Sequence, residues 1–174
     1  MKRLYLIKGL ALAAVLLVLA SGITAFAENQ QLPFKAEGPE YVVQEAPHPD
    51  CGPGRLKVEI VGSGEGTYLG HYTIVRQHCF NLATADIEYG YFEQTAANGD
   101  MLWGTYSGTF AGVLEVAEDG SPVVIQISSS WTITGGTGRF AEAEGSGDAV
   151  GVFNLANEEG YFDIDGWISF DASK

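Results

Sequence analysis

The chain has 174 residues, of which 22 are acidic and only 9 are Lys or Arg, so its formal net charge is −13 at pH 7. A surface this acidic repels nucleic acid and anionic membranes, because both need a positive face on the protein. The length is sufficient for one domain of ordinary size with its own core.

The first residues have the pattern of a secretory signal peptide. A basic segment over 1–8 precedes an apolar run over 9–20, and Ala25-Phe26-Ala27 matches the small-x-small cleavage pattern. The apolar run is near the short end for a membrane span. We therefore expect cleavage near Ala27 and export to the periplasm, the cell surface or the medium, with no stable membrane insertion afterwards. An uncleaved membrane anchor is the alternative.

The rest of the chain divides into an initial segment over 28–54 and a β-barrel domain over 55–174. The initial segment is interrupted by prolines and contains one candidate strand, over 40–45. From residue 55 onward apolar and polar residues alternate with a period close to two, which is typical of strands. Turns rich in Gly, Asn and Asp separate these segments, and Asn98-Gly99 is a strong hairpin signal.

This pattern predicts an all-β fold. Roughly eight strands joined by short turns indicate an antiparallel meander. A twisted meander of this size tends to close into a barrel, because closure removes the exposed strand edges. Glycines inside the predicted strands agree with a barrel, since they relieve crowding where strands bend. We also expect a short helical turn near 138–143. A two-sheet sandwich is the alternative architecture.

The two cysteines, Cys51 and Cys79, are expected to form a disulfide, because an exported chain meets an oxidising compartment. The glycine-rich segment 62–66 predicts a hairpin turn centred near Gly64. Such a hairpin pairs residues whose numbers add up to about 128–130, as those of the two cysteines do. A redox pair or a metal site is the alternative, although the chain has no C-x-x-C motif.

Three short segments resemble parts of a known family. Gly135-Gly-Thr-Gly-Arg-Phe-Ala-Glu-Ala-Glu-Gly-Ser-Gly147 looks like the glycine-rich corner of the allene oxide cyclase and dirigent barrels. The segments 65–73 and 95–100 resemble a strand and a hairpin of the same barrels, most closely those of related secreted bacterial proteins. The resemblance implies an antiparallel barrel and, as in the characterised members, a hydrophobic cavity. Those members cyclise a lipid epoxide or guide a radical coupling. A corner motif that shapes a fold does not transfer an activity, so no catalytic residue is assigned.

The candidate ligand-binding residues are three aromatic side chains and one histidine. Aromatic residues are frequent in the predicted strands, where they either fill the core or line a pocket. For a pocket, we expect Tyr89, Tyr106 and Trp131 near it. His71 has the same parity as Leu69 and could point into the barrel as a lone base. A hydrogen-bonded structural role for this histidine is the alternative.

Other kinds of site find little support. The segment 136–141 satisfies G-x-G-x-x-A, but Gly145 and Gly147 would end any following helix, so no dinucleotide cofactor is expected. His71 and His78 would face opposite sides of a regular strand, so no metal site is expected. There is no G-x-S-x-G elbow for a serine hydrolase.

Together these features predict an exported barrel that binds a small apolar ligand or acts as a non-catalytic scaffold. The first alternative is an enzyme similar to allene oxide cyclase or the dirigent proteins, acting on a reactive hydrophobic substrate in its cavity. The second is a surface protein that self-associates, with a homo-oligomer as the assembly. No cofactor and no nucleic-acid partner are expected.

Overall fold

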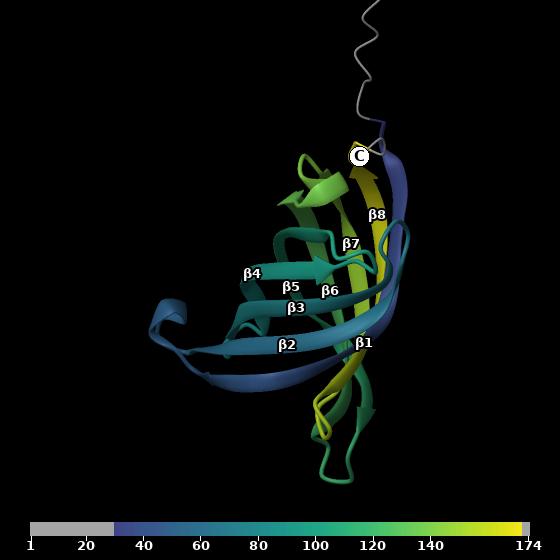
Figure 1. The fold of residues 1–174 in the computed structure, drawn as a ribbon. Coiled ribbons are helices and arrows are strands. Elements are labelled where there is room, and N and C mark those ends of the chain that lie inside the picture. The colour runs from purple at the N-terminus through teal and green to yellow at the C-terminus, as the bar shows by residue number, and fades with distance from the viewer. Residues whose placement is uncertain (1–29, 172–174) are drawn as a thin grey trace, which may run out of the picture.

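The computed structural model describes residues 30–171, which form one closed barrel of antiparallel strands (Figure 1). Each strand pairs with its neighbours along the chain, and β8 pairs with β1 to complete the barrel. The predicted all-β meander is therefore confirmed. The predicted signal peptide over 1–27 lies outside the described residues. The strands are β1 (Leu32–Pro47), β2 (Arg55–Gly66), β3 (Gly70–Asn81), β4 (Asp86–Thr95), β5 (Met101–Val116), β6 (Pro122–Gly136), β7 (Glu144–Asn154) and β8 (Glu159–Ser169).

Strand β1 is longer than the sequence indicates. It spans Leu32–Pro47, whereas alternation alone predicts a strand only over 40–45. Its inward residues include Gly38 and Glu40 as well as Phe34. Because one of them has no side chain and another is charged, the sequence does not show a regular alternation of apolar and polar residues here. Gly38 is required because the backbone of Ser63 in β2 passes directly against it. The barrel therefore begins within the initial segment rather than after it.

The glycine-rich segment 62–66 belongs to a strand and not to a turn. Strand β2 continues to Gly66, and the chain reverses over residues 67–69 instead. A Cβ atom at Gly62 would come within 2.6 Å of the carbonyl oxygen of Pro39 in β1. These glycines therefore allow two strands to approach closely, and the hairpin register predicted from a turn at Gly64 is wrong.

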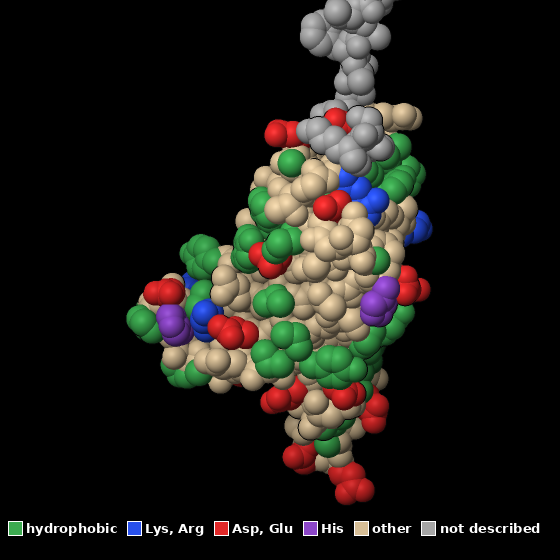
Figure 2. Space-filling view, viewed as in Figure 1, with side chains coloured by type: hydrophobic (Ala, Val, Ile, Leu, Met, Phe, Trp, Pro, Cys, Tyr) green, Lys and Arg blue, Asp and Glu red, His purple; other side chains and the backbone are tan. Residues whose placement is uncertain are grey.

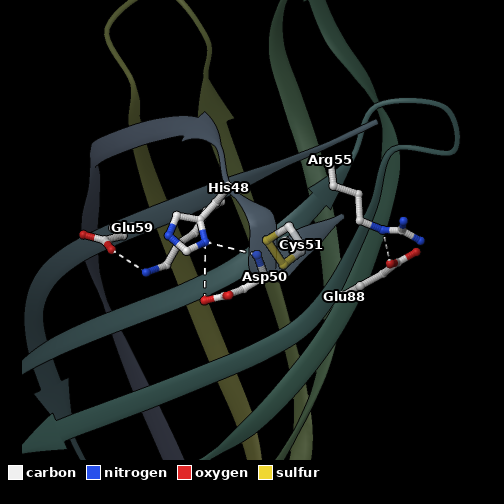
Figure 3. The surroundings of a disulfide bond; sticks show 8 residues. His48, Asp50, Cys51, Arg55, Glu59 and Glu88 are labelled. Atoms are coloured by element: carbon white, nitrogen blue, oxygen red, sulfur yellow. Dashed lines mark hydrogen bonds and ion pairs between the residues drawn. A yellow bond between two sulfur atoms is a disulfide. The ribbon is translucent and has the colours of Figure 1, made fainter. Parts of the chain in front are cut away.

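The predicted disulfide is confirmed, although the hairpin register does not explain it. Cys51 and Cys79 are bonded, with their Cα atoms 5.5 Å apart. Cys79 lies in β3 opposite Lys57, while Cys51 ends the short 3-10 helix η1 (Pro49–Cys51) between β1 and β2. Figure 3 shows the bond joining this connection to the barrel wall. The disulfide thus fastens the β1–β2 connection next to His78.

One end of the barrel is closed by the three segments that carry the family resemblance. The 3-10 helix η2 (Gly138–Phe140) is the short turn expected there, and Phe140 is fully buried. The guanidinium of Arg139 lies over the Phe140 ring, 4.8 Å from its centroid, and donates a hydrogen bond to the carbonyl oxygen of Tyr68. Its Nε is 3.7 Å from an Asp100 carboxylate oxygen. This end lies near the end of β8 in Figure 1.

The half of the interior next to this closed end is filled by side chains. Only a void of about 20 Å³ remains there. At the opposite end, the β1–β2 connection and the β5–β6 hairpin extend away from the barrel in different directions (Figure 1). The filled half is built mainly from large apolar residues of six strands, namely Phe34, Ile74, Phe92, Leu102, Trp131, Ile133 and Ile164.

Candidate functional site

The other half of the interior contains a cavity of about 130 Å³, to which every strand of the barrel contributes. Glu45, Phe110 and Leu155 lie on its border and are exposed, so the cavity opens to solvent at this end. A cavity of about 150 Å³ is large enough to hold benzene. The space therefore suits a ligand with one aromatic ring or a hydrocarbon chain of similar volume. Its walls are mainly apolar, formed by Val58, Ile60, Phe80, Ile87, Ile127, Phe153 and Phe162.

Three buried polar side chains form the floor of this cavity. Arg76, Tyr106 and Ser129 border both the cavity and the small void in the filled half, so they separate the two spaces. The Arg76 guanidinium lies over two aromatic rings, 5.4 Å from the centroid of Tyr106 and 5.3 Å from that of Phe162. The attraction between a cation and aromatic faces helps to hold the guanidinium at this depth.

Arg76 forms a buried ion pair with Glu40. Its Nη2 atom is 2.9 Å from the Glu40 Oε1 atom, and both side chains are almost inaccessible to solvent. The two residues come from β1 and β3, which flank β2. Burial raises the pKa of Glu40, and the positive charge of Arg76 opposes that rise. With both groups ionised, the pair adds no net charge to the interior.

The ion pair leaves hydrogen-bonding capacity unused. The Oε2 atom of Glu40 and the Nε atom of Arg76 are buried and have no hydrogen-bond partner among residues 30–171. Buried polar atoms are almost always paired, and each unpaired one costs about 1–3 kcal/mol. The guanidinium has five N–H donors. The Nε atom is inaccessible from the cavity, so water or a ligand there can meet Arg76 only through its other guanidinium N–H groups.

His78 and Tyr106 form a second buried polar pair. The His78 Nδ1 atom is 2.7 Å from the Tyr106 hydroxyl oxygen. Burial lowers the pKa of His78 to about 4, and the nearby charge of Arg76 adds to this effect. Burial also raises the pKa of Tyr106. At neutral pH the imidazole is therefore uncharged and the phenol is protonated, and the two groups share one hydrogen bond whose direction follows the histidine tautomer.

Two of the four residues predicted to bind a ligand lie in the interior. Tyr106 borders the cavity, whereas Trp131 lies beneath its floor in the filled half. The Trp131 ring packs edge-on against Phe34, with 5.5 Å between centroids, and its Nε1 donates to the carbonyl oxygen of Asp148 at 3.1 Å. Tyr106 is therefore placed to meet a ligand, and Trp131 supports the core behind it.

The expectation that His71 points into the barrel is wrong. Its side chain is 66% exposed, and its Nδ1 atom is 3.2 Å from a carboxylate oxygen of Glu65 on the outer surface. On β3 the even-numbered residues face inward, beginning with Tyr72. The prediction placed the preceding turn too early in the chain and therefore assigned the wrong parity to this strand.

Tyr89 is also on the outer surface, where it is 76% exposed. Its φ angle is 55°, and it lies at the point where the β4–β5 pairing changes register between Ile87 and Gly90. Such a bulge adds a residue to one strand and breaks the alternation. Tyr89 therefore does not follow Ile87 into the interior, as the sequence pattern predicted.

The sequence pattern missed Glu40, Arg76 and His78. For two of them the sequence contained a signal. Arg76 and His78 have the same parity as Ile74, so they lie on an apolar face of the strand. Charged or titratable side chains are rarely buried on such a face without a partner, so this pattern indicates a buried polar pair. Glu40 gave no comparable signal. Its partner lies on a strand that is not its neighbour, and only the closed barrel brings the two together.

The outer surface is mixed in character on the face that Figure 2 shows. Figure 2 shows hydrophobic side chains in small groups among polar ones, with acidic side chains toward the tip of the β5–β6 hairpin. Within residues 30–171, no cluster of three or more His, Cys, Asp or Glu side chains is arranged to hold a metal ion. No helix in this part of the chain has the length and apolar character needed to cross a membrane.

Comparison with known proteins gives no relative from which a role could be taken. No family model matches the chain, and no significant match was found among curated proteins or solved structures. The functional argument therefore depends on the geometry of the cavity and its floor.

Proposed function

We propose that the protein is a binding protein whose barrel holds one small, mainly apolar molecule in the cavity. The observation that carries this proposal is an open cavity of about 130 Å³ with apolar walls and a few buried polar side chains, Arg76, His78 and Tyr106, on one side. Sites for small molecules typically combine these features. The sequence resemblance to barrels whose characterised members enclose a hydrophobic cavity supports the same proposal, as does the predicted export of the chain.

The volume sets the expected affinity. A ligand with about six to nine non-hydrogen atoms gains at most about 1.5 kcal/mol per atom, and ordering and desolvation reduce that gain. We therefore expect dissociation constants in the range of about 1 μM to 1 mM for simple aromatic probes. A natural ligand of higher affinity would have a substituent that extends through the mouth past Glu45 and Leu155.

The test is a titration of the purified protein with toluene, followed by NMR chemical shifts of the protein. We expect saturable shifts for residues of the cavity walls. The variant Ile127→Trp places a large ring in the cavity and should weaken toluene binding at least about tenfold. The matched control Ser128→Trp adds the same ring on the outer face, because Ser128 is exposed, and should bind toluene as the natural protein does.

Two results would contradict the proposal. One is the absence of saturable binding by the folded natural protein. The other is an unchanged toluene affinity in a folded Ile127→Trp variant, which would place the binding elsewhere.

A further inference from the structure

The hydrogen-bonding groups on the cavity floor indicate the class of the ligand, provided that the cavity binds a small molecule as proposed above. We propose that the ligand is an uncharged aromatic molecule with one carbonyl oxygen, and that this oxygen accepts a hydrogen bond from the Arg76 guanidinium. Three properties of the site lead to this choice: the donors that it offers, its balance of charge and its size.

Arg76 offers donors to the cavity. It lines the cavity and can only donate, and its Nη2 atom is the one that lies 2.9 Å from Glu40. The Nδ1 atom of His78 is engaged with the Tyr106 hydroxyl oxygen at 2.7 Å, so it is not free for a ligand. A side chain that only donates calls for an acceptor on the ligand. A carbonyl oxygen accepts two hydrogen bonds and carries no proton of its own, whereas an amine would bring more donors to a site that already has them.

The charge balance excludes an anion as the preferred ligand. Arg76 is the charged side chain of the floor, and the Glu40 carboxylate, 2.9 Å from it, compensates its charge. His78 and Tyr106 are uncharged at neutral pH, and burial raises the pKa of neighbouring Tyr72 to about 12, so it is uncharged as well. A carboxylate ligand would add an uncompensated buried charge close to the Glu40 carboxylate. It would bind well only together with a proton.

The size of the cavity favours a single ring. The volume of about 130 Å³ is close to that of cavities that hold benzene. The rings of Phe162 and Tyr106 border the space and offer edges and faces to an aromatic ligand. A ring in the apolar part of the cavity with a carbonyl group directed at the floor satisfies both regions.

The experiment compares three probes of nearly equal size in the natural protein: ethylbenzene, acetophenone and benzoate. Isothermal titration calorimetry at pH 7.5 should show acetophenone binding at least about tenfold more tightly than either of the others, since only it supplies an uncharged acceptor. Titrations of benzoate in buffers of different ionisation enthalpy should show that one proton is taken up with each benzoate bound.

The variant Glu40→Gln tests the balance of charge. It leaves an amide oxygen for Arg76 and gives the floor a positive charge, so benzoate should gain at least about tenfold in affinity relative to acetophenone. The matched control is Glu142→Gln, which makes the same change in total charge on the exposed surface of the closed end and should leave the ratio of the two affinities within about threefold. Near-ultraviolet circular dichroism checks that each variant is folded.

The outcomes separate this inference from the proposed function. If none of the probes binds, the proposed function itself fails. If ethylbenzene binds but acetophenone binds no more tightly, the cavity is a simple apolar site and the inference is wrong. The inference is also overturned if the natural protein binds benzoate as tightly as acetophenone without proton uptake. This last measurement needs no variant, so it decides the matter even if Glu40→Gln does not fold.

Discussion

Replacing His78 by glutamine should remove a large part of the loss of stability in acid. In the folded protein, burial and the charge of Arg76 lower the pKa of His78 to about 4. In the unfolded chain the pKa is about 6.5. The unfolded state therefore binds more protons between these values, and the free energy of unfolding falls as the pH falls from about 6.5 to about 4. A shift of this size corresponds to about 3 kcal/mol lost between pH 7.5 and pH 4.

Glutamine is the appropriate replacement because its amide can accept from or donate to the Tyr106 hydroxyl and its side chain does not titrate. Glu40 makes an opposite contribution, since burial raises its pKa. The stability due to this group falls as the pH rises above the pKa of a glutamate in the unfolded chain. This contribution is present in both proteins. The difference between their pH profiles therefore isolates His78.

The assay is urea unfolding from pH 4 to pH 8, followed by tryptophan fluorescence, for the natural protein and for His78→Gln. The difference between their free energies of unfolding should change by about 3 kcal/mol across this range, in favour of the variant at low pH. The control is His71→Gln, which makes the same substitution at an exposed position of the same strand. Parallel profiles for the natural protein and His78→Gln would refute the reasoning.

Two more predictions concern stability. Replacing both Cys51 and Cys79 by alanine should lower the free energy of unfolding by about 3.5 kcal/mol in the chain-entropy model, since the bond closes a loop with a sequence separation of 28. Urea unfolding measures this loss. Replacing Gly64 by alanine should cost more than about 2 kcal/mol, because the new Cβ would collide with the Glu37 backbone and lie 2.9 Å from the Tyr72 hydroxyl oxygen.

Each of these variants has a control. The natural protein treated with a reducing agent should lose the same stability as the double alanine variant, and a loss below about 1 kcal/mol in both would contradict the role given to the disulfide. The control for Gly64→Ala is Gly112→Ala, where nothing lies within 4 Å of the added Cβ and a change within about 0.5 kcal/mol is expected. Equal losses in both glycine variants would count against a steric cause.

Part of the candidate site follows from local patterns. The frequency of aromatic residues in the strands predicts Tyr106 near a pocket, and Tyr106 lies at the cavity border in the structure. His71 and Tyr89 were assigned to the interior as well and are exposed, for two separate reasons. The turn before His71 was placed too early, and the bulge at Tyr89 interrupts the alternation. A shift of one residue is enough to move a side chain to the other face of a strand.

The sequence by itself determined the class of the fold. Alternation with a period of two, short turns and two cysteines in a chain with a predicted export signal predict an antiparallel barrel with one disulfide, because these features depend on local backbone preferences and on a single covalent pair. Only the tertiary structure decided which polar side chains meet inside. The Glu40–Arg76 pair spans non-adjacent strands, and Tyr106 meets His78 across β4. Closure of the barrel sets these distances, and no local pattern along the chain encodes them.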